Sequence, residues 1–259
     1  IDKMIHLSEA IAKSIVDDLL KQKGLEAVFV AGDLTEDGDM ISHYATRDIL
    51  QRLVDNGLKV FVINGNHDIT RRPESIGPKA NAQEFRDVYW TMGYENAVER
   101  DDYSLSYSAD VNDDYRLIAI DTDSYYSNDF GANKENIDTR LIEWTETQVK
   151  KAVEDGKTPL AIAHHPLFNH WADAMELVLQ GIGHAPDPNA VALADILADN
   201  GCNYLFVGHI HGQSVYTHTN QEGNRLFQVM TASTVYLPAS YRYVRFMKAN
   251  TYIDSVFLQ

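Results

Sequence analysis

The 259-residue sequence predicts an α/β fold in which two mixed β-sheets pack face to face between outer helices, a four-layer αββα sandwich. Before Ser214, apolar runs rich in β-branched residues alternate with helical segments, a pattern typical of parallel strands joined by right-handed crossovers. From Ser214 onward, short strand-like segments follow one another without helices. The alternative fold is a simple doubly wound sheet with a β appendage.

Hydrophobic periodicity and turn residues place the individual elements. Ser8 is the expected cap of the first helix, because apolar residues recur at helical spacing after it and Gly24 follows them. The predicted elements are, in order, a helix from Ser8 to Gly24, strands at 27–31 and 59–63 around a helix at 41–54, a loop at 71–78, a helix at 84–92, strands at 104–108 and 115–120, helices at 139–153 and 191–198 that precede strands at 159–163 and 203–207, and strands at 215–217, 225–230, 241–246 and 251–258.

Composition limits the classes of partner. A hydrophobic content of 44% suits one domain over residues 1–259, and no stretch reaches the ~20 apolar residues of a transmembrane helix. The net charge of −16 disfavours a long nucleic acid, because such binding relies on lysine and arginine. The lone Cys202 is expected to be a packed thiol, since it precedes an apolar strand. We expect a soluble protein, cytoplasmic or extracytoplasmic, and the sequence leaves its oligomeric state open.

Four apolar runs end in residues that bind metals or transfer protons. Gly32-Asp33 follows the first strand, and Gly65-Asn66-His67-Asp68 follows the second. His164-His165-Pro166 and Gly208-His209-Ile210-His211 follow two later strands. Because strand ends are where α/β proteins place their functional groups, we expect these residues to form one site.

The residue types favour a transition-metal centre. Asp33 offers two oxygens that can bridge two ions, Asn66 offers a carbonyl oxygen, and the histidines offer nitrogens. Mixed nitrogen and oxygen donors without thiolate favour Mn, Fe, Zn, Co or Ni over Ca or Mg. In an extended Gly208–His211 segment, His209 and His211 would point to the same side and reach one two-metal site. Such a pair of ions is suited to phosphoester cleavage.

The ordered motifs Gly-Asp, Gly-Asn-His-Asp, His-x-Pro and Gly-His-x-His resemble those of the calcineurin-like metallophosphoesterases over about residues 25–215. The resemblance implies that fold and two divalent ions, Mn, Fe or Zn. In it, Asp33 would bridge the ions, Asn66, His164 and His209 would complete one site, and His211 would serve the other. His164 is preferred over His165 because related purple acid phosphatases carry the ligand first in His-x-Pro.

The resemblance also implies a dinuclear phosphoesterase in which a metal-bridging hydroxide attacks phosphorus. His67 would bind the phosphate and act as general acid toward the leaving oxygen, and Asp68 would orient His67. The segment from Asp33 to the His-His-Pro motif looks like the cyclic-nucleotide phosphodiesterase branch. We therefore expect hydrolysis of a small phosphodiester, with cyclic nucleotides as candidates.

One motif of the family is missing. Its Asp-x-His should end a strand upstream of Asp33, and Asp2 and His6 have the wrong spacing for it. We therefore expect a domain that lacks its first strand, with only Asp33 and His211 for the second ion. Alternative functions are a catalytically inactive scaffold or binding protein, a phosphomonoesterase, and a nuclease, which the acidic charge disfavours.

The other polar and aromatic residues are expected to play structural or surface roles. His165 is expected to be packed or to support a metal ligand, and Asp121 to end its strand as a turn residue or as support for the site. The remaining ones are Arg71, Arg72, His170 and His184, expected to be solvated, and Trp144, Tyr241 and Tyr243, expected in the core.

Overall fold

The computed structural model describes residues 3–69, 78–123, 137–168, 188–237, 239–248 and 250–258. After a short 3₁₀ turn at Ile5–Leu7, its elements are α1 (Ser8–Leu19), β1 (Ala27–Ala31), α2 (Met40–Asp55), β2 (Lys59–Ile63), α3 (Ala82–Val88), β3 (Ala97–Arg100), β4 (Tyr107–Asp110), β5 (Tyr115–Ile120), α4 (Thr139–Glu154), β6 (Thr158–Ala163), α6 (Pro188–Asp199), β7 (Tyr204–Val207), β8 (Ser214–Thr219), β9 (Arg225–Met230), β10 (Ser240–Phe246) and β11 (Thr251–Phe257).

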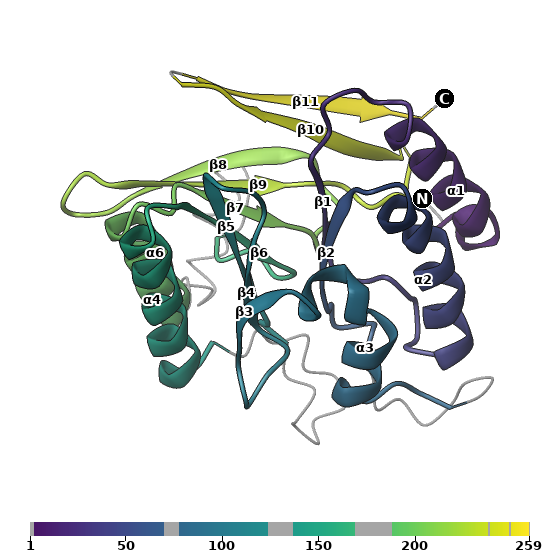
Figure 1. The fold of residues 1–259 in the computed structure, drawn as a ribbon, viewed down its shortest axis with the longest axis horizontal. Helices are drawn as coiled ribbons and strands as arrows, with labels where there is room; N and C mark the ends of the chain where they lie inside the picture. Colours follow the sequence, from purple (N-terminus) through teal and green to yellow (C-terminus); the bar gives the residue numbers. More distant parts are fainter. Residues whose placement is uncertain are drawn as a thin grey trace, which may run out of the picture.

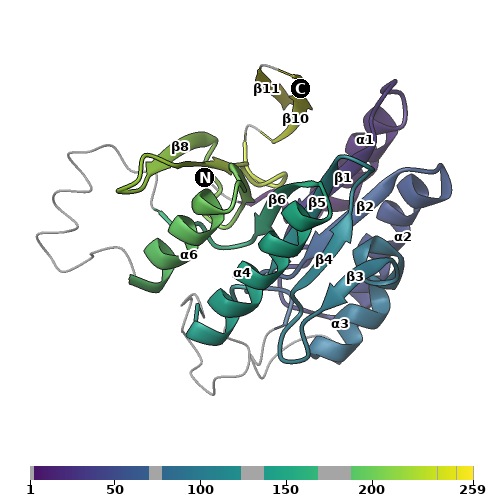
Figure 2. The same ribbon diagram turned by 60° about the vertical axis from the view of Figure 1, so that its left-hand side comes forward.

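The elements form the predicted four layers (Figures 1 and 2). A seven-stranded mixed sheet has the strand order β3-β4-β5-β6-β7-β9-β8. Helices α4 and α6 pack on one face of it through one apolar cluster. Its other face packs through a second cluster against β1, β2 and β10, with α1, α2 and α3 outside them. The fold class is confirmed, but the layer facing the large sheet consists of two separate pairs, parallel β1–β2 and antiparallel β10–β11.

Parallel pairing brings the carboxyl ends of the central strands to one edge. Strands β5, β6, β7 and β9 run parallel, as do β1 and β2. The loop after β7 meets the loop after β6, where Gly208 N donates a 3.1 Å hydrogen bond to His164 O. Ala31 O at the end of β1 accepts a 2.7 Å hydrogen bond from His164 Nδ1. Three of the four motif-bearing strands thus deliver their loops to the same place.

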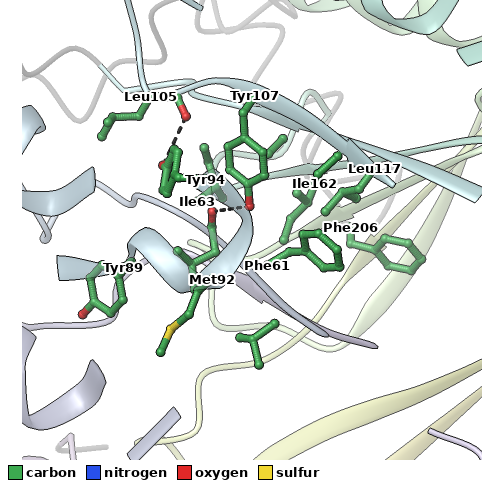
Figure 3. Packing of buried hydrophobic residues seen from close by; sticks show 14 of the residues in the cluster. Phe61, Ile63, Tyr89, Met92, Tyr94, Leu105, Tyr107, Leu117, Ile162 and Phe206 are labelled. Atoms are coloured by element: carbon green, nitrogen blue, oxygen red, sulfur yellow. Dashed lines mark hydrogen bonds between the residues drawn. The ribbon is translucent and has the colours of Figure 1, made fainter. Parts of the chain in front are cut away.

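Buried tyrosines fix β2 against the large sheet (Figure 3). Tyr107 is fully buried, and its hydroxyl donates a 2.9 Å bond to Val62 O. Tyr94 packs on its ring and donates to Leu105 O. A Cβ on Gly93, which has φ of 113°, would lie 2.3 Å from the Tyr107 hydroxyl, so this turn needs glycine. These contacts anchor the strand that leads to Asn66.

Several predicted boundaries are wrong, and among them α1 ends at Leu19, short of the Gly24 expected to close it. Leu7, without a side-chain cap, takes the N-cap position of α1 instead of Ser8. The helix expected at 84–92 ends at Val88. The strand expected at 104–108 begins only at Tyr107, because the preceding residues are held by side-chain bonds instead of a ladder, such as Leu105 N to Asp121 Oδ2 at 2.9 Å.

The aromatic residues expected in the core are packed there, with Trp144 against one cluster and Tyr241 and Tyr243 against the other. Cys202 is fully buried, as expected for a packed thiol. In the part of the chain that the structure describes, no helix is long and apolar enough to cross a membrane.

Candidate metal centre

Side chains from three strand ends meet in a small triangle of lone-pair atoms. Asn66 Oδ1 lies 3.1 Å from His164 Nε2 and 3.0 Å from His209 Nδ1, and the two nitrogens lie 3.2 Å apart. Asp33 Oδ2 lies 3.3 Å from His164 Nε2. Four of the five predicted metal ligands are therefore brought together, at the ends of β1, β2, β6 and β7.

The hydrogen bond behind His164 determines what its other nitrogen can do. Ala31 O only accepts, so Nδ1 of His164 carries a proton in every charge state, and in the neutral ring Nε2 has its lone pair toward Asn66 and His209. A second hydrogen bond of this kind commonly orients metal-binding imidazoles. His164 is thus held in the tautomer that binds a metal ion.

The electrostatics of the triangle favour a positive charge inside it. Burial alone would lower the pKa of His164, but the hydrogen bond and charge of Asp33 raise it to about 9. Burial alone would raise the pKa of Asp33, yet His164 and the His67 N–H hold it below its ordinary value. Burial and the charge on His164 lower the pKa of His209 to about 4. The pocket therefore keeps a cation at Nε2 of His164 to well above neutral pH.

The spacing of these atoms fits a divalent ion. Ligands about 2.1 Å from an ion lie about 3.0 Å apart at right angles and about 3.4 Å apart in a tetrahedron. The observed separations of 3.0–3.3 Å match that range. A metal ion at this point accepts the lone pairs of all four atoms at once. A proton on His164 Nε2 can be shared with only some of its three neighbours. The donor set of the described residues therefore fits the metal predicted from the sequence.

The backbone of the candidate ligands is strained. Asp33, His209 and His211 have φ of 53°, 65° and 59°, and they are the non-glycine residues with positive φ in the described ranges. Such conformations cost about 1–3 kcal/mol each and cluster at functional sites. They also contradict the extended Gly208–His211 segment expected from the sequence.

As a consequence, His209 and His211 separate. His209 joins the triangle, whereas the ring of His211 packs against Tyr236 with centroids 4.7 Å apart. Within the described part of the chain, no hydrogen bond or ion pair joins His211 to Asp33. Its pKa is lowered by partial burial and then by the charge of Lys3, while the charge of Asp33 raises it. This fifth predicted ligand is therefore near enough to feel the charge of Asp33 but is not hydrogen-bonded to the triangle.

His67 lies beside the triangle with a defined tautomer. Its backbone N–H donates to Asp33 Oδ1 at 3.0 Å, and its Nδ1 donates to Glu36 O at 2.6 Å. Because a carbonyl only accepts, Nδ1 carries a proton in every charge state of the ring. Among the described residues, no hydrogen bond reaches Nε2, so that nitrogen is the one available to a ligand.

Asp68 has different partners from the one predicted. Its carboxylate accepts bonds from Thr35 N at 2.9 Å and Gly65 N at 2.8 Å, and no contact to the His67 imidazole occurs among the described residues. Burial raises the pKa of Asp68, and the nearby Asp33 raises it further. The expectation that Asp68 orients His67 is therefore wrong in the structure, because this carboxylate joins the loops after β1 and β2 and the Glu36 carbonyl orients His67.

Sequence reasoning missed His43, a fully buried residue of α2. Its Nε2 donates to Asp68 O at 2.9 Å, and its Nδ1 accepts from the Tyr89 hydroxyl at 3.0 Å. This chain of bonds fixes the turn that carries Asn66 and His67. A histidine within an amphipathic helix has no sequence signal that would predict these hydrogen bonds.

His165 and Asp121 are buried next to the site, as expected of supporting residues. Asp121 Oδ1 and Asp123 Oδ2 each accept a 2.9 Å bond from Asn64 Nδ2, two residues before Asn66. Arg71, Arg72, His170 and His184 lie outside the described residues.

The fold and the donor set define an α/β protein with a candidate metal centre of nitrogen and oxygen ligands at its strand ends. The family model for calcineurin-like phosphoesterases matches residues 5–213. The chain therefore belongs to the calcineurin-like phosphoesterase family. Membership supports a metal-dependent hydrolase of phosphoesters.

A solved dimetal phosphatase shares this fold. A dimetal phosphatase from Danio rerio has a TM-score of 0.65 at 11% identity, and the match covers 98% of this chain and 87% of that one. PhoD has a TM-score of 0.47 at 14% identity, with 88% and 54% of the two chains covered. No curated protein sequence matches the chain.

Proposed function

We propose that the chain hydrolyses a small phosphodiester, with cyclic nucleotides as the candidate class. The observation that carries the proposal is the position of His67, whose backbone binds Asp33 Oδ1 at 3.0 Å while its Nε2 is left without a partner among the described residues. An acid group therefore stands next to the donor set that would hold a divalent ion. When bound, divalent ions supply Lewis acidity and lower the pKa of a coordinated water molecule.

In this proposal Asp33, Asn66, His164 and His209 hold one ion, and Asp33 and His211 serve the second. The protein's own acid chemistry then falls to His67. With Nδ1 fixed on Glu36 O, the protonated ring presents its second N–H at Nε2. That N–H is the group that donates a proton to the departing oxygen, and the ring is left in its neutral Nδ1–H form. The Glu36 carbonyl thus maintains the correct tautomer through the cycle.

Among the described residues, the charges near the site support a diester over a monoester. Lys3, whose charge acts on His211, is paired with both carboxylate oxygens of Glu36 at 2.8 Å. A lysine paired in this way contributes little net charge to a bound phosphate. A diester carries one negative charge, whereas a monoester carries up to two near neutral pH and needs more compensation.

The test compares leaving groups. A 3′,5′-cyclic nucleotide releases an alkoxide, which needs a proton, whereas bis-p-nitrophenyl phosphate releases a stable phenolate. With added Mn, His67→Ala should lower kcat on the cyclic nucleotide about 10²–10⁴-fold and on the phenyl diester less than tenfold. The mono-p-nitrophenyl ester should be the slower phenyl substrate.

The matched control is His6→Ala, which removes an exposed imidazole of the first 3₁₀ turn and should leave both rates unchanged. Equal losses on the two diesters would contradict the acid role of His67. Faster hydrolysis of the monoester would identify a phosphomonoesterase. Absence of any hydrolysis by protein with two ions bound would identify the inactive scaffold instead.

A further inference from the structure

His165 is a buried histidine with one unmet nitrogen. It is 1% exposed and follows His164 directly after β6. Its Nδ1 lies 3.1 Å from Thr122 Oγ1 and 3.6 Å from Asp123 Oδ1. Its Nε2 is buried without a hydrogen-bond partner among the described residues. Buried polar atoms are nearly always paired, so an unmet ring nitrogen beside a candidate metal centre needs an explanation.

The unmet nitrogen of His165 is explained by its position beside two candidate metal ligands. Its ring centroid lies 4.4 Å from that of His209 and 5.0 Å from that of His164. One ligand nitrogen from each of the three histidines lies within 4.8 Å of the others. Two nitrogens on opposite sides of one ion are about 4.2 Å apart, twice an ion–nitrogen distance of about 2.1 Å. That separation lies within the 4.8 Å limit, so the three nitrogens are close enough to share one ion.

The partners of Nδ1 fit the same role. Thr122 Oγ1 and Asp123 Oδ1 are oxygens that can accept a proton from Nδ1, and in that tautomer the lone pair is on Nε2. Metal-binding imidazoles commonly have a hydroxyl, carbonyl or carboxylate behind the nitrogen that does not bind. His164 has the Ala31 carbonyl in that place. In both His164 and His165, an oxygen atom thus lies next to Nδ1, the ring nitrogen that would not bind the ion.

We propose that His165 binds, through Nε2, the same ion as His164 and His209. The centre then has three imidazoles together with Asn66 and Asp33. Such a nitrogen-rich set favours Zn, Fe, Co or Ni over Mg or Ca. Most of the ligands then belong to one site, so this site should bind an ion before the second site, formed by Asp33 and His211, does. The inference rests on the metal centre of the proposed function.

The test counts imidazoles around one paramagnetic ion. In His211→Ala protein loaded with one equivalent of Co²⁺, each ligating histidine gives one strongly shifted N–H signal in the proton NMR spectrum, which disappears in D₂O. Three such signals are expected, from His164, His165 and His209. Two signals would overturn the proposal and leave the metal centre intact. No bound Co²⁺ would contradict the metal centre itself.

A variant pair gives an independent readout. His165→Gln should weaken Co²⁺ binding about tenfold or more by calorimetry and remove one shifted signal. His218→Gln is the control, because this histidine pairs with Asp195 between β8 and α6 and should change neither quantity. If His165→Gln fails to fold, the signal count in the parent protein still decides. Unchanged affinity in folded His165→Gln, together with an unchanged signal count, would overturn the proposal.

Discussion

Gly65→Ala should disrupt the candidate metal centre more than any other addition of one methyl group. A Cβ at Gly65 would lie 2.3 Å from Asp33 Oδ1 and 2.4 Å from Asp33 N. It would also lie 2.8 Å from His164 Cε1. Because one of these neighbours is backbone, side-chain rotation cannot relieve the contact.

The required movement follows from these distances. Real Cβ contacts essentially never fall below 3.0 Å, so Asp33 must move by at least about 0.7 Å, the difference between 2.3 and 3.0 Å. Metal sites tolerate deviations of about 0.2 Å in ligand distance. We therefore expect loss of at least tenfold in affinity for Zn or Mn, and a loss of about 1–3 kcal/mol in the free energy of unfolding, as for overpacked cores.

Calorimetric metal titration and urea unfolding measure the two effects. Gly212→Ala is the matched control, because a Cβ there meets only Met230 Sδ at 3.6 Å, an ordinary contact. That variant lies beside His211 yet should bind metal normally. Wild-type affinity in folded Gly65→Ala protein would refute the packing of Gly65 between Asp33 and His164.

Three further predictions concern protonation, the buried network and the thiol. The pKa of His164 is raised from about 6.5 to about 9, so the metal-free protein should lose up to about 3 kcal/mol of its free energy of unfolding in urea as pH rises from 6.5 to 9. Asp33→Asn should abolish that loss. A flat pH profile in the wild-type protein would contradict the ion pair between Asp33 and His164. His43→Leu leaves the buried Asp68 O unpaired and removes one of the two bonds of the Tyr89 hydroxyl, so it should cost about 1–3 kcal/mol in urea unfolding, whereas a cost below about 0.5 kcal/mol would exclude the network. Burial raises the pKa of Cys202 to about 12, so a disulfide reagent at pH 8 should label it only after unfolding, and rapid labelling of native protein would show that it is accessible.

The sequence predicted the layers and the strand ends because apolar runs and glycine-flanked motifs are local signals. The bounds of β9, Arg225–Met230, agree with the predicted strand. The division of the second sheet layer into two pairs was not predictable, since periodicity identifies strands but not their neighbours.

Within the candidate site, residue types were predictable and orientations were not. Asn66, His164 and His209 converge as expected from their motifs. The expectation that His209 and His211 point to the same side assumed an extended backbone, which their φ values of 65° and 59° contradict. The partner of His67 is a backbone carbonyl 31 residues away, and no side-chain pattern identifies a carbonyl.

Anomalous diffraction from a crystal grown with Zn or Mn tests the central claim most directly. We expect an anomalous peak about 2.0–2.2 Å from Asn66 Oδ1, His164 Nε2 and His209 Nδ1, between side chains that already lie 3.0–3.2 Å apart. Peaks only at other positions, with none at this point at a metal concentration that supports hydrolysis, would contradict the account.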